Sequence, residues 1–364
     1  MPGFALFLFS LLQAAPALAR DYDTYRSDYF KGAFCTAIGG ACAADNDLVS
    51  GLFQNPAALA TGEPDWDFDG DYASRDIAEQ GVNGTSGAVD SSAVGGIGYS
   101  TGRWGAGLAF IWRRSSVNSP TTLVEDNGKT INTTLYGNAY SAQIRLPVAY
   151  HFDNGGSVGI TFSLNRQDQR LDLIDPSEAV QNQPSSTELR FTVGGLMPIS
   201  EKIRLGTWFR SGVTLADYIA FTSTSTGFVS YKETFSQHAP WIWALGAAYE
   251  ASPSWTLYAE NDLIGNTPQG YLFTYSNFSA SPPASALVEK GRSVVFEPHA
   301  GARHSFNEKL GIHFGSYFEN SRWEKVNGRI HGTAGVSYQF GKLVEVIAGA
   351  DVARSYTQLF FTFR

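Results

Sequence analysis

The chain has 364 residues, of which 43% are hydrophobic and 16% charged, with a formal net charge of −8. This acidic balance, without any basic run, argues against a nucleic-acid-binding protein, which would present clustered Lys and Arg. A count of 38 glycines, 14% aromatic residues and two methionines is atypical of a helical cytosolic enzyme. It is typical of short strands, tight turns and aromatic girdles.

Residues 1–19, MPGFALFLFSLLQAAPALA, form an apolar run that ends in Ala17-Leu18-Ala19. This pattern predicts a secretory signal peptide, although it lacks the usual positive amino-terminal region. The alternative is a membrane anchor helix; Pro16 and the small residues at the end favour cleavage after Ala19. No later stretch approaches the ~18 continuous apolar residues of a spanning helix.

Residues 20–62 are predicted to form a plug, because Gly32 to Ala60 is the one long non-alternating segment of the mature chain. Capping carboxylates, apolar residues at helical spacing and a terminating Asn-Pro pair indicate short helical pieces. The candidate plug or gate residues are Asp45, Asp47, Leu52, Phe53, Asn55, Pro56 and Ala57.

The two cysteines, Cys35 and Cys42, lie in this same segment, seven residues apart. They can form one small-loop disulfide, which would fit an oxidising compartment. The alternative is a pair of reduced, buried small residues.

From Asp65 onward the hydrophobic period is two. In Tyr140 to Phe152, for example, Ile144, Leu146 and Val148 share one face and Gln143 and Arg145 the other. Thirteen alternating residues suit a tilted membrane strand, whose apolar band needs ~9–11 residues. About 14 such strands are predicted, an even number as single-chain bacterial barrels have. They lie near 65–75, 92–101, 104–114, 136–152, 155–168, 186–199, 202–213, 238–250, 254–265, 292–306, 309–320, 328–340, 343–353 and 356–363.

The connections between these strands alternate between short turns, such as Asp153-Asn154-Gly155, and long polar stretches, such as Ser115 to Thr134. Outer-membrane barrels have this layout, with tight periplasmic turns and extended outer loops. We therefore predict an all-β antiparallel transmembrane barrel over residues 63–364, located in the bacterial outer membrane with both termini periplasmic. A barrel of ~14 strands is wider than its own side chains can fill, so the plug is expected inside it.

The last strand, TQLFFTFR, has Thr357, Leu359, Phe361 and Phe363 on one face. This aromatic ending resembles the signal that outer-membrane barrels present to the barrel-assembly machinery. Arg364 departs from that pattern.

The stretch GGACAADNDLVSGLFQNPAALA resembles the start of the FadL-type family of outer-membrane transporters for long-chain fatty acids and other hydrophobic compounds. Pro240 to Gly265 and Pro298 to Glu319 resemble strand–turn–strand segments of the same family. The resemblance implies passive uptake of a hydrophobic ligand, which is captured by apolar outer loops and released past a movable plug. A related group with similar amino-terminal segments serves protein secretion, so a non-transporting secretion partner or surface scaffold stays open.

No enzyme motif stands out: G-x-S-x-G, H-E-x-x-H and C-x-x-C are all missing from the sequence. We therefore expect no enzyme activity, no cofactor and no metal site. His299, His313 and His331 fall on three successive predicted strands, but at different heights, so they are expected to line the lumen rather than bind a metal.

Inward charges of both signs predict a paired lumen network with Asp45 and Asp47, because buried charges require partners. The alternative is that Arg145 or Arg190 binds the carboxylate of a ligand. Aromatic residues in two predicted outer loops, including Phe221, Phe228, Phe273 and Tyr275, are candidates for an apolar entry groove. An aromatic girdle or self-packed loop is the alternative. Gly95, Gly96 and Gly98 could mark a kink in the second strand. In the family such a kink makes a lateral opening toward the bilayer.

Overall fold

The computed structural model describes residues 31–60, 64–81, 84–124, 130–174, 179–182, 185–223, 229–265, 292–320, 328–341, 344–354 and 356–364. These residues form two short α-helices, one 3-10 helix and 17 strands. The strands are β1 Pro64–Gly81, β2 Gly84–Thr101, β3 Trp104–Val124, β4 Thr130–His151, β5 Ser157–Ile174, β6 Ala179–Asn182, β7 Ser185–Pro198, β8 Ile203–Arg210, β9 Val213–Ser223, β10 Val229–Ala239, β11 Ile242–Ser252, β12 Trp255–Ile264, β13 Val295–Ser305, β14 Leu310–Glu319, β15 Arg329–Phe340, β16 Val344–Ala353 and β17 Tyr356–Phe363.

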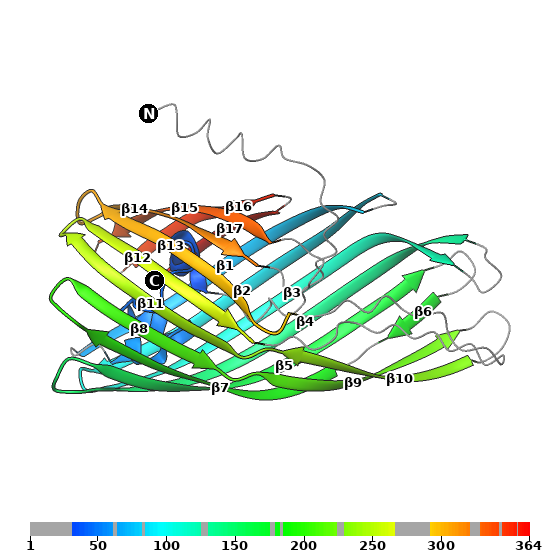
Figure 1. The fold of residues 1–364 in the computed structure, drawn as a ribbon, viewed down its shortest axis with the longest axis horizontal. Helices are drawn as coiled ribbons and strands as arrows, with labels where there is room; N and C mark the ends of the chain where they lie inside the picture. Colours follow the sequence, from blue (N-terminus) through cyan, green and yellow to red (C-terminus); the bar gives the residue numbers. More distant parts are fainter. Residues whose placement is uncertain are drawn as a thin grey trace, which may run out of the picture.

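The strands form a closed antiparallel barrel (Figure 1). Most strands pair with the preceding and following strand of the chain, but β5 pairs with both β6 and β7, β8 pairs with β11, and β9 and β10 pair with each other. Strand β1 closes the ring by pairing with β17 from Gly70–Phe363 to Ile77–Tyr356. Strands β6 and β7 are successive parts of one barrel strand, and the same holds for β8 with β9 and for β10 with β11. The 17 strands therefore make a barrel of 14 strands. The predicted fold class and strand number are therefore confirmed.

Short turns join the strands at one end of the barrel, which we call the short-turn end. Glycines at three of these turns, Gly102, Gly155 and Gly341, have φ values of 90°, 85° and 70°, a region that residues with a Cβ rarely adopt. The predicted short turn Asp153-Asn154-Gly155 thus joins β4 to β5, which pair antiparallel up to His151–Ser157.

The predicted long loops were wrong in their extent. Much of Ser115 to Thr134 belongs to β3 and β4, which pair out to Val124–Thr130. Likewise, Thr214 to Gln237 consists mostly of β9 and β10, which pair with each other from Val213–Ala239 to Ser223–Val229. Polar Ser, Thr and Asn in these stretches suggested loops, but antiparallel pairing satisfies their backbone and Thr favours strands. Phe221 accordingly lies in β9 and not in a loop.

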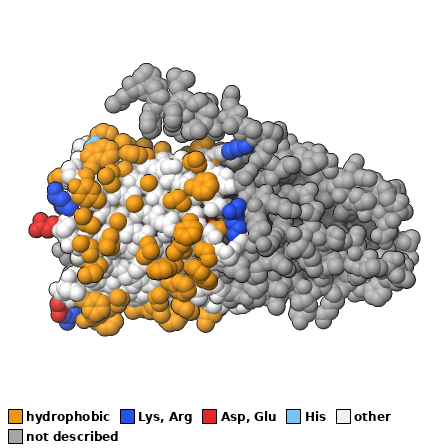
Figure 2. Space-filling view, viewed as in Figure 1, with side chains coloured by type: hydrophobic (Ala, Val, Ile, Leu, Met, Phe, Trp, Pro, Cys, Tyr) orange, Lys and Arg blue, Asp and Glu red, His pale blue; other side chains and the backbone are white. Residues whose placement is uncertain are grey.

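The outward face of the barrel carries an apolar band. Leu189, Phe296 and Phe162 are 68%, 57% and 50% exposed. At the short-turn end several aromatic side chains are in mutual contact, as in Trp66–Tyr99 and Trp104–Tyr150, with ring centroids 4.3 and 4.8 Å apart. On the face shown in Figure 2, charged side chains appear at the two ends of the described surface, with hydrophobic side chains between them. Such a band with an aromatic girdle is typical of barrels that span lipid.

The core lies inside the barrel, where residues 31–60 pack against the wall. This segment contains α2 Gly32–Ala37, α3 Leu48–Phe53 and the 3-10 helix η3 Pro56–Leu59. We call residues 31–60 the plug. Figure 1 shows it, in dark blue, at the short-turn end of the barrel. Among the described residues, no helix is long and apolar enough to cross a membrane.

Candidate functional site between the plug and the barrel wall

The plug folds as the capping residues predict. The Asp47 side chain accepts a hydrogen bond from the Val49 amide at 2.9 Å and begins α3. The Asn55 side chain accepts from the Ala57 amide at 3.2 Å, and Pro56 occupies the first turn of η3. These side chains supply acceptors to helix amides that have no partner within the helix, which explains why such short helices persist.

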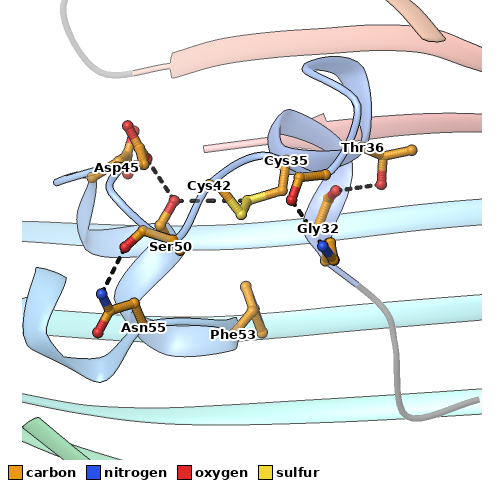
Figure 3. Close-up of a disulfide and its surroundings, with 12 residues drawn as sticks. Gly32, Cys35, Thr36, Cys42, Asp45, Ser50, Phe53 and Asn55 are labelled. Carbon is orange, nitrogen blue, oxygen red and sulfur yellow. Dashed lines mark hydrogen bonds between the residues drawn. A yellow bond between two sulfur atoms is a disulfide. The ribbon is translucent and has the colours of Figure 1, made fainter. Parts of the chain in front are cut away.

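Cys35 and Cys42 are joined by a disulfide with their Cα atoms 5.6 Å apart (Figure 3). The closed loop contains Gly39 and Gly40, whose φ values are +70° and +76°. Its carbonyl groups face wall and plug donors: His299 Nδ1 lies 2.7 Å from the Gly39 oxygen, and Lys31 donates to the Gly40 oxygen at 2.8 Å. The disulfide therefore closes the part of the plug that contacts β13.

Glycines of the wall make room for the plug backbone. A Cβ at Gly194 would lie 2.0 Å from Asn55 Oδ1, and one at Gly206 would lie 1.9 Å from the Ala43 oxygen. The same close approach occurs on other strands around the barrel, where a Cβ at Gly105, Gly159, Gly301 or Gly315 would lie within 2.5 Å of plug backbone. Only glycine permits these contacts, so the wall holds the plug on several sides at once.

A buried ion cluster joins the start of the plug to β12. Lys31 donates to Glu260 and Asp262 at 3.3 and 3.0 Å, and all three side chains are at most 6% exposed. Glu260 also accepts from the Ala43 amide at 2.6 Å. Burial lowers the pKa of Lys31, and the charge of Glu260 opposes this effect. The cluster ties the plug to the wall through charges that are expensive to separate.

Asp45 is buried within the plug, where it accepts a hydrogen bond from Ser50 Oγ at 2.6 Å (Figure 3). Burial raises the pKa of Asp45, and the nearby charge of Asp47 raises it further. Asp45 thus helps to organise the plug internally, whereas Asp47 lies at its partly exposed tip beside the exposed Asn46.

The most distinctive part of the site is an interruption of the β3–β4 ladder behind Leu52, across which the register of the two strands is kept. The β3–β4 ladder pairs Ala106 with Val148 and Ala109 with Arg145, but skips the two positions between them. Pro147 lies there, and proline has no amide hydrogen to donate. The neighbouring ladders β2–β3 and β4–β5 run through this level. We call the interruption at Gly107, Leu108, Leu146 and Pro147 the wall gap.

Leu52 fills the inner side of the wall gap. A Cβ at Gly107 would lie 2.4 Å from Leu52 Cδ2, and one at Gly96 would lie 2.9 Å from Leu52 Cδ1. Leu52 is 1% exposed and belongs to an apolar cluster with Leu48, Val49, Phe53, Leu59 and the wall residues Val94, Ala109, Ile111 and Ala149. An apolar side chain of the plug therefore stands between the lumen and an interrupted ladder.

The structure places the two arginines considered for ligand binding among protein partners. Arg145 donates to Gln143 at 2.6 Å and to the Phe53 carbonyl. Arg190 pairs with Glu188 on its own strand at 2.8 Å. Of the aromatic candidates, Phe228, Phe273 and Tyr275 lie outside the described residues, and the side chain of Phe221 is likewise not described. The role of these four aromatic residues stays a prediction from the sequence.

The three histidines differ in their contacts, although His299 and His331 both stack on Tyr317, with ring centroids 5.2 and 4.2 Å apart. His299 contacts the Gly39 carbonyl, and His331 lies between Asp351 and Glu319, with ring nitrogens 2.8 and 2.6 Å from their carboxylates. His313 packs edge-on against Phe34 with ring centroids 5.4 Å apart. Within the described ranges, no group of three or more His, Cys, Asp or Glu side chains is arranged to hold a metal.

Sequence reasoning missed the glycines that face the plug and the wall gap. Their signal was present, because Gly105 and Gly107 occupy inward positions of β3 and Pro147 an inward position of β4. Glycines two residues apart on a strand mark a place where another backbone approaches. The sequence alone does not show which backbone approaches these glycines, because that depends on where the plug docks.

The sequence matches no protein-family model and no curated protein, but the fold has close structural counterparts. The toluene transporter TbuX of Ralstonia pickettii superimposes with a TM-score of 0.63 at 17% identity, over 91% of this chain and 96% of that one. The Pseudomonas putida toluene transporter TodX gives 0.67 at 11% identity, over 91% and 96%. A Pseudomonas aeruginosa FadL homologue gives 0.65 at 10% identity, over 92% and 96%. The chain has the FadL-type barrel fold. At these identities the likeness concerns the fold.

Proposed function

We propose that the protein is an outer-membrane channel for the passive uptake of small hydrophobic molecules, with no catalytic activity. The observation that carries this proposal is the wall gap closed by Leu52, within a fold shared with two toluene transporters. The apolar outer band and aromatic girdle support membrane insertion, with the short-turn end and both termini on the periplasmic side.

In this mechanism an apolar ligand is captured on the outer loops, where Phe221, Phe228, Phe273 and Tyr275 are the candidates. It then enters the lumen above the plug. Transfer of the ligand out of water supplies the driving free energy, ~0.8 kcal/mol for each buried CH₂ group. Uptake proceeds down the concentration gradient.

Release requires movement of the plug, and the contacts limit which part moves. The Lys31 cluster and the close packing at the wall glycines oppose withdrawal of the whole plug, and the disulfide keeps the loop between Cys35 and Cys42 closed. A small displacement of α3 is sufficient to carry Leu52 away from the wall gap. The ligand then leaves laterally through the wall into the bilayer.

An uncharged hydrocarbon fits the described lumen better than a fatty acid. Arg145 and Arg190, the candidates for binding a carboxylate, already donate to Phe53 and Glu188. A carboxylate would have to compete with these partners and would lose its hydration.

Uptake by intact cells tests the proposal. Cells that produce the protein should take up a labelled monoaromatic hydrocarbon faster than cells that lack it, and a labelled sugar at the same rate. Lipid extraction and mass spectrometry of the purified protein should reveal a co-purified apolar compound. Equal hydrocarbon uptake by both cell types, together with no extracted ligand, would refute the channel function.

The second candidate is a barrel that transports nothing and serves as a secretion partner or surface scaffold. The paired charges of the described lumen, such as Lys31 with Asp262 and Arg190 with Glu188, favour it. A scaffold has no reason to interrupt a ladder behind an apolar side chain, so the wall gap favours the channel. The uptake measurement separates the two.

A further inference from the structure

Helix α3, which carries Leu52, is held at its amino-terminal end by an arginine from the far end of the chain. Arg364 bonds to Asp47, the capping residue of α3, and its Nε donates to Glu345 at 2.7 Å. The guanidinium also lies over the Phe34 ring, 5.2 Å from its centroid. One side chain therefore joins α3, α2 and the β16–β17 pair.

At its other end, α3 is held by two further arginines. Arg145 on β4 and Arg210 on β8 both donate to the carbonyl of Phe53, the last residue of α3, the latter at 3.4 Å. A helix leaves its last carbonyl groups without partners and carries partial negative charge there, so cationic donors stabilise this end. Arg145 and Arg210 are 2% and 4% exposed.

We propose that Arg364, Arg145 and Arg210 are positioning residues that clamp α3 and so keep Leu52 in the wall gap. The Arg364–Asp47 contact is the release point of this clamp. The Asp47 side chain is 23% exposed and that of Arg364 is 8% exposed, whereas the two arginines at the Phe53 end are buried. Water reaches the first contact more easily, so the amino-terminal end of α3 separates from the wall first. The clamp also explains why a charged residue follows the aromatic end of β17.

Asp47→Asn is the cleanest variant, because asparagine caps a helix as well as aspartate does but carries no charge. Arg364→Gln removes the same ion pair from the other side. Arg329→Gln is the matched control: it removes an arginine that pairs with Glu319 and joins two strands of the same wall. Hydrogen exchange reports the opening of α3 through the amides of Gly51 and Gln54, which bond to the carbonyl groups of Asp47 and Ser50.

We expect exchange at Gly51 and Gln54 to accelerate by about 10-fold in both clamp variants and to be unchanged in Arg329→Gln, while the barrel strands stay protected. The Asp47→Asn/Arg364→Gln double variant should exchange no faster than the worse single variant, because the two residues form one contact. Unchanged exchange in the clamp variants, equal acceleration in the control, or simple additivity would overturn the clamp.

The clamp rests on the proposed function only for its effect on uptake. In the cell assay, Asp47→Asn should raise hydrocarbon uptake several-fold, with no change in the ligand that co-purifies. Faster exchange with unchanged uptake would leave the clamp standing and would refute release past α3. The exchange measurement therefore tests the clamp, and the uptake measurement tests release of the ligand past α3.

Discussion

Replacing Gly194 by alanine tests whether the wall glycines hold the plug. The new Cβ would lie 2.0 Å from Asn55 Oδ1 and 2.9 Å from Pro56 Cδ, where ordinary contacts begin near 3.4 Å. Asn55 cannot turn away freely, because its side chain donates to the Ala43 and Gly195 carbonyl groups at 2.7 and 3.0 Å and caps η3. The plug must therefore shift or lose these bonds.

Overpacking of this kind costs about 1–3 kcal/mol, and each lost hydrogen bond about 1 kcal/mol more. The lower end of this range, about 2 kcal/mol, corresponds to a factor of about 30 in the equilibrium for plug opening. Gly195→Ala is the matched control on the adjacent position, where the nearest atom to the new Cβ lies 3.7 Å away. Hydrogen exchange of residues 55–59, measured in detergent, should accelerate in Gly194→Ala alone. Equal exchange in the two variants would refute the role of the wall glycines.

Three other predictions concern the plug. Leu52→Ala should raise hydrocarbon uptake, since it empties the wall gap, whereas Leu48→Ala in the same apolar cluster should not; equal uptake in the cell assay would contradict the wall-gap route. Replacing both Cys35 and Cys42 by alanine should weaken the plug loop by about 2.4 kcal/mol, from the chain entropy of a seven-residue separation. Unchanged amide hydrogen exchange of residues 35–42 in the double variant would contradict stabilisation of the loop by the disulfide. Burial raises the pKa of Asp45, so the folded plug binds the proton of this carboxyl group more tightly than the unfolded chain does. Plug stability should therefore be greatest below the ordinary pKa of 3.8 and should fall as the pH rises from 3.8 through the raised pKa. Protection factors measured across this range should lose their pH dependence in Asp45→Asn, and a dependence that survives the substitution would refute the assignment.

Much of the fold was predictable because it depends on short-range patterns. Alternation of period two placed the strands, and turn residues such as Asp153-Asn154-Gly155 placed the short turns. The strand ends opposite the short-turn end were mispredicted, since Ser, Thr and Asn in Ser115 to Thr134 are compatible with both loops and paired strands. Pairing between strands decided that question, and composition could not.

The candidate site was predictable in part. The capping roles of Asp47 and Asn55 follow from local sequence, and both side chains accept helix amides in the structure. The partners of Arg145 could not be derived, because residue 53 and residue 145 meet only after the plug docks inside the closed barrel. The same holds for Arg364 and Asp47, which are 317 positions apart.

The sequence by itself determined that strands alternate with turns, that their number is even and that one non-alternating segment is available to fill the barrel. These properties depend on the two-residue period of a strand and on turn chemistry, which neighbouring residues express. Only the tertiary structure decided which glycines receive the plug, that Pro147 interrupts a ladder behind Leu52 and that three arginines hold α3. Those contacts join residues far apart in the chain, and closure of the barrel through β1 and β17 brings them together.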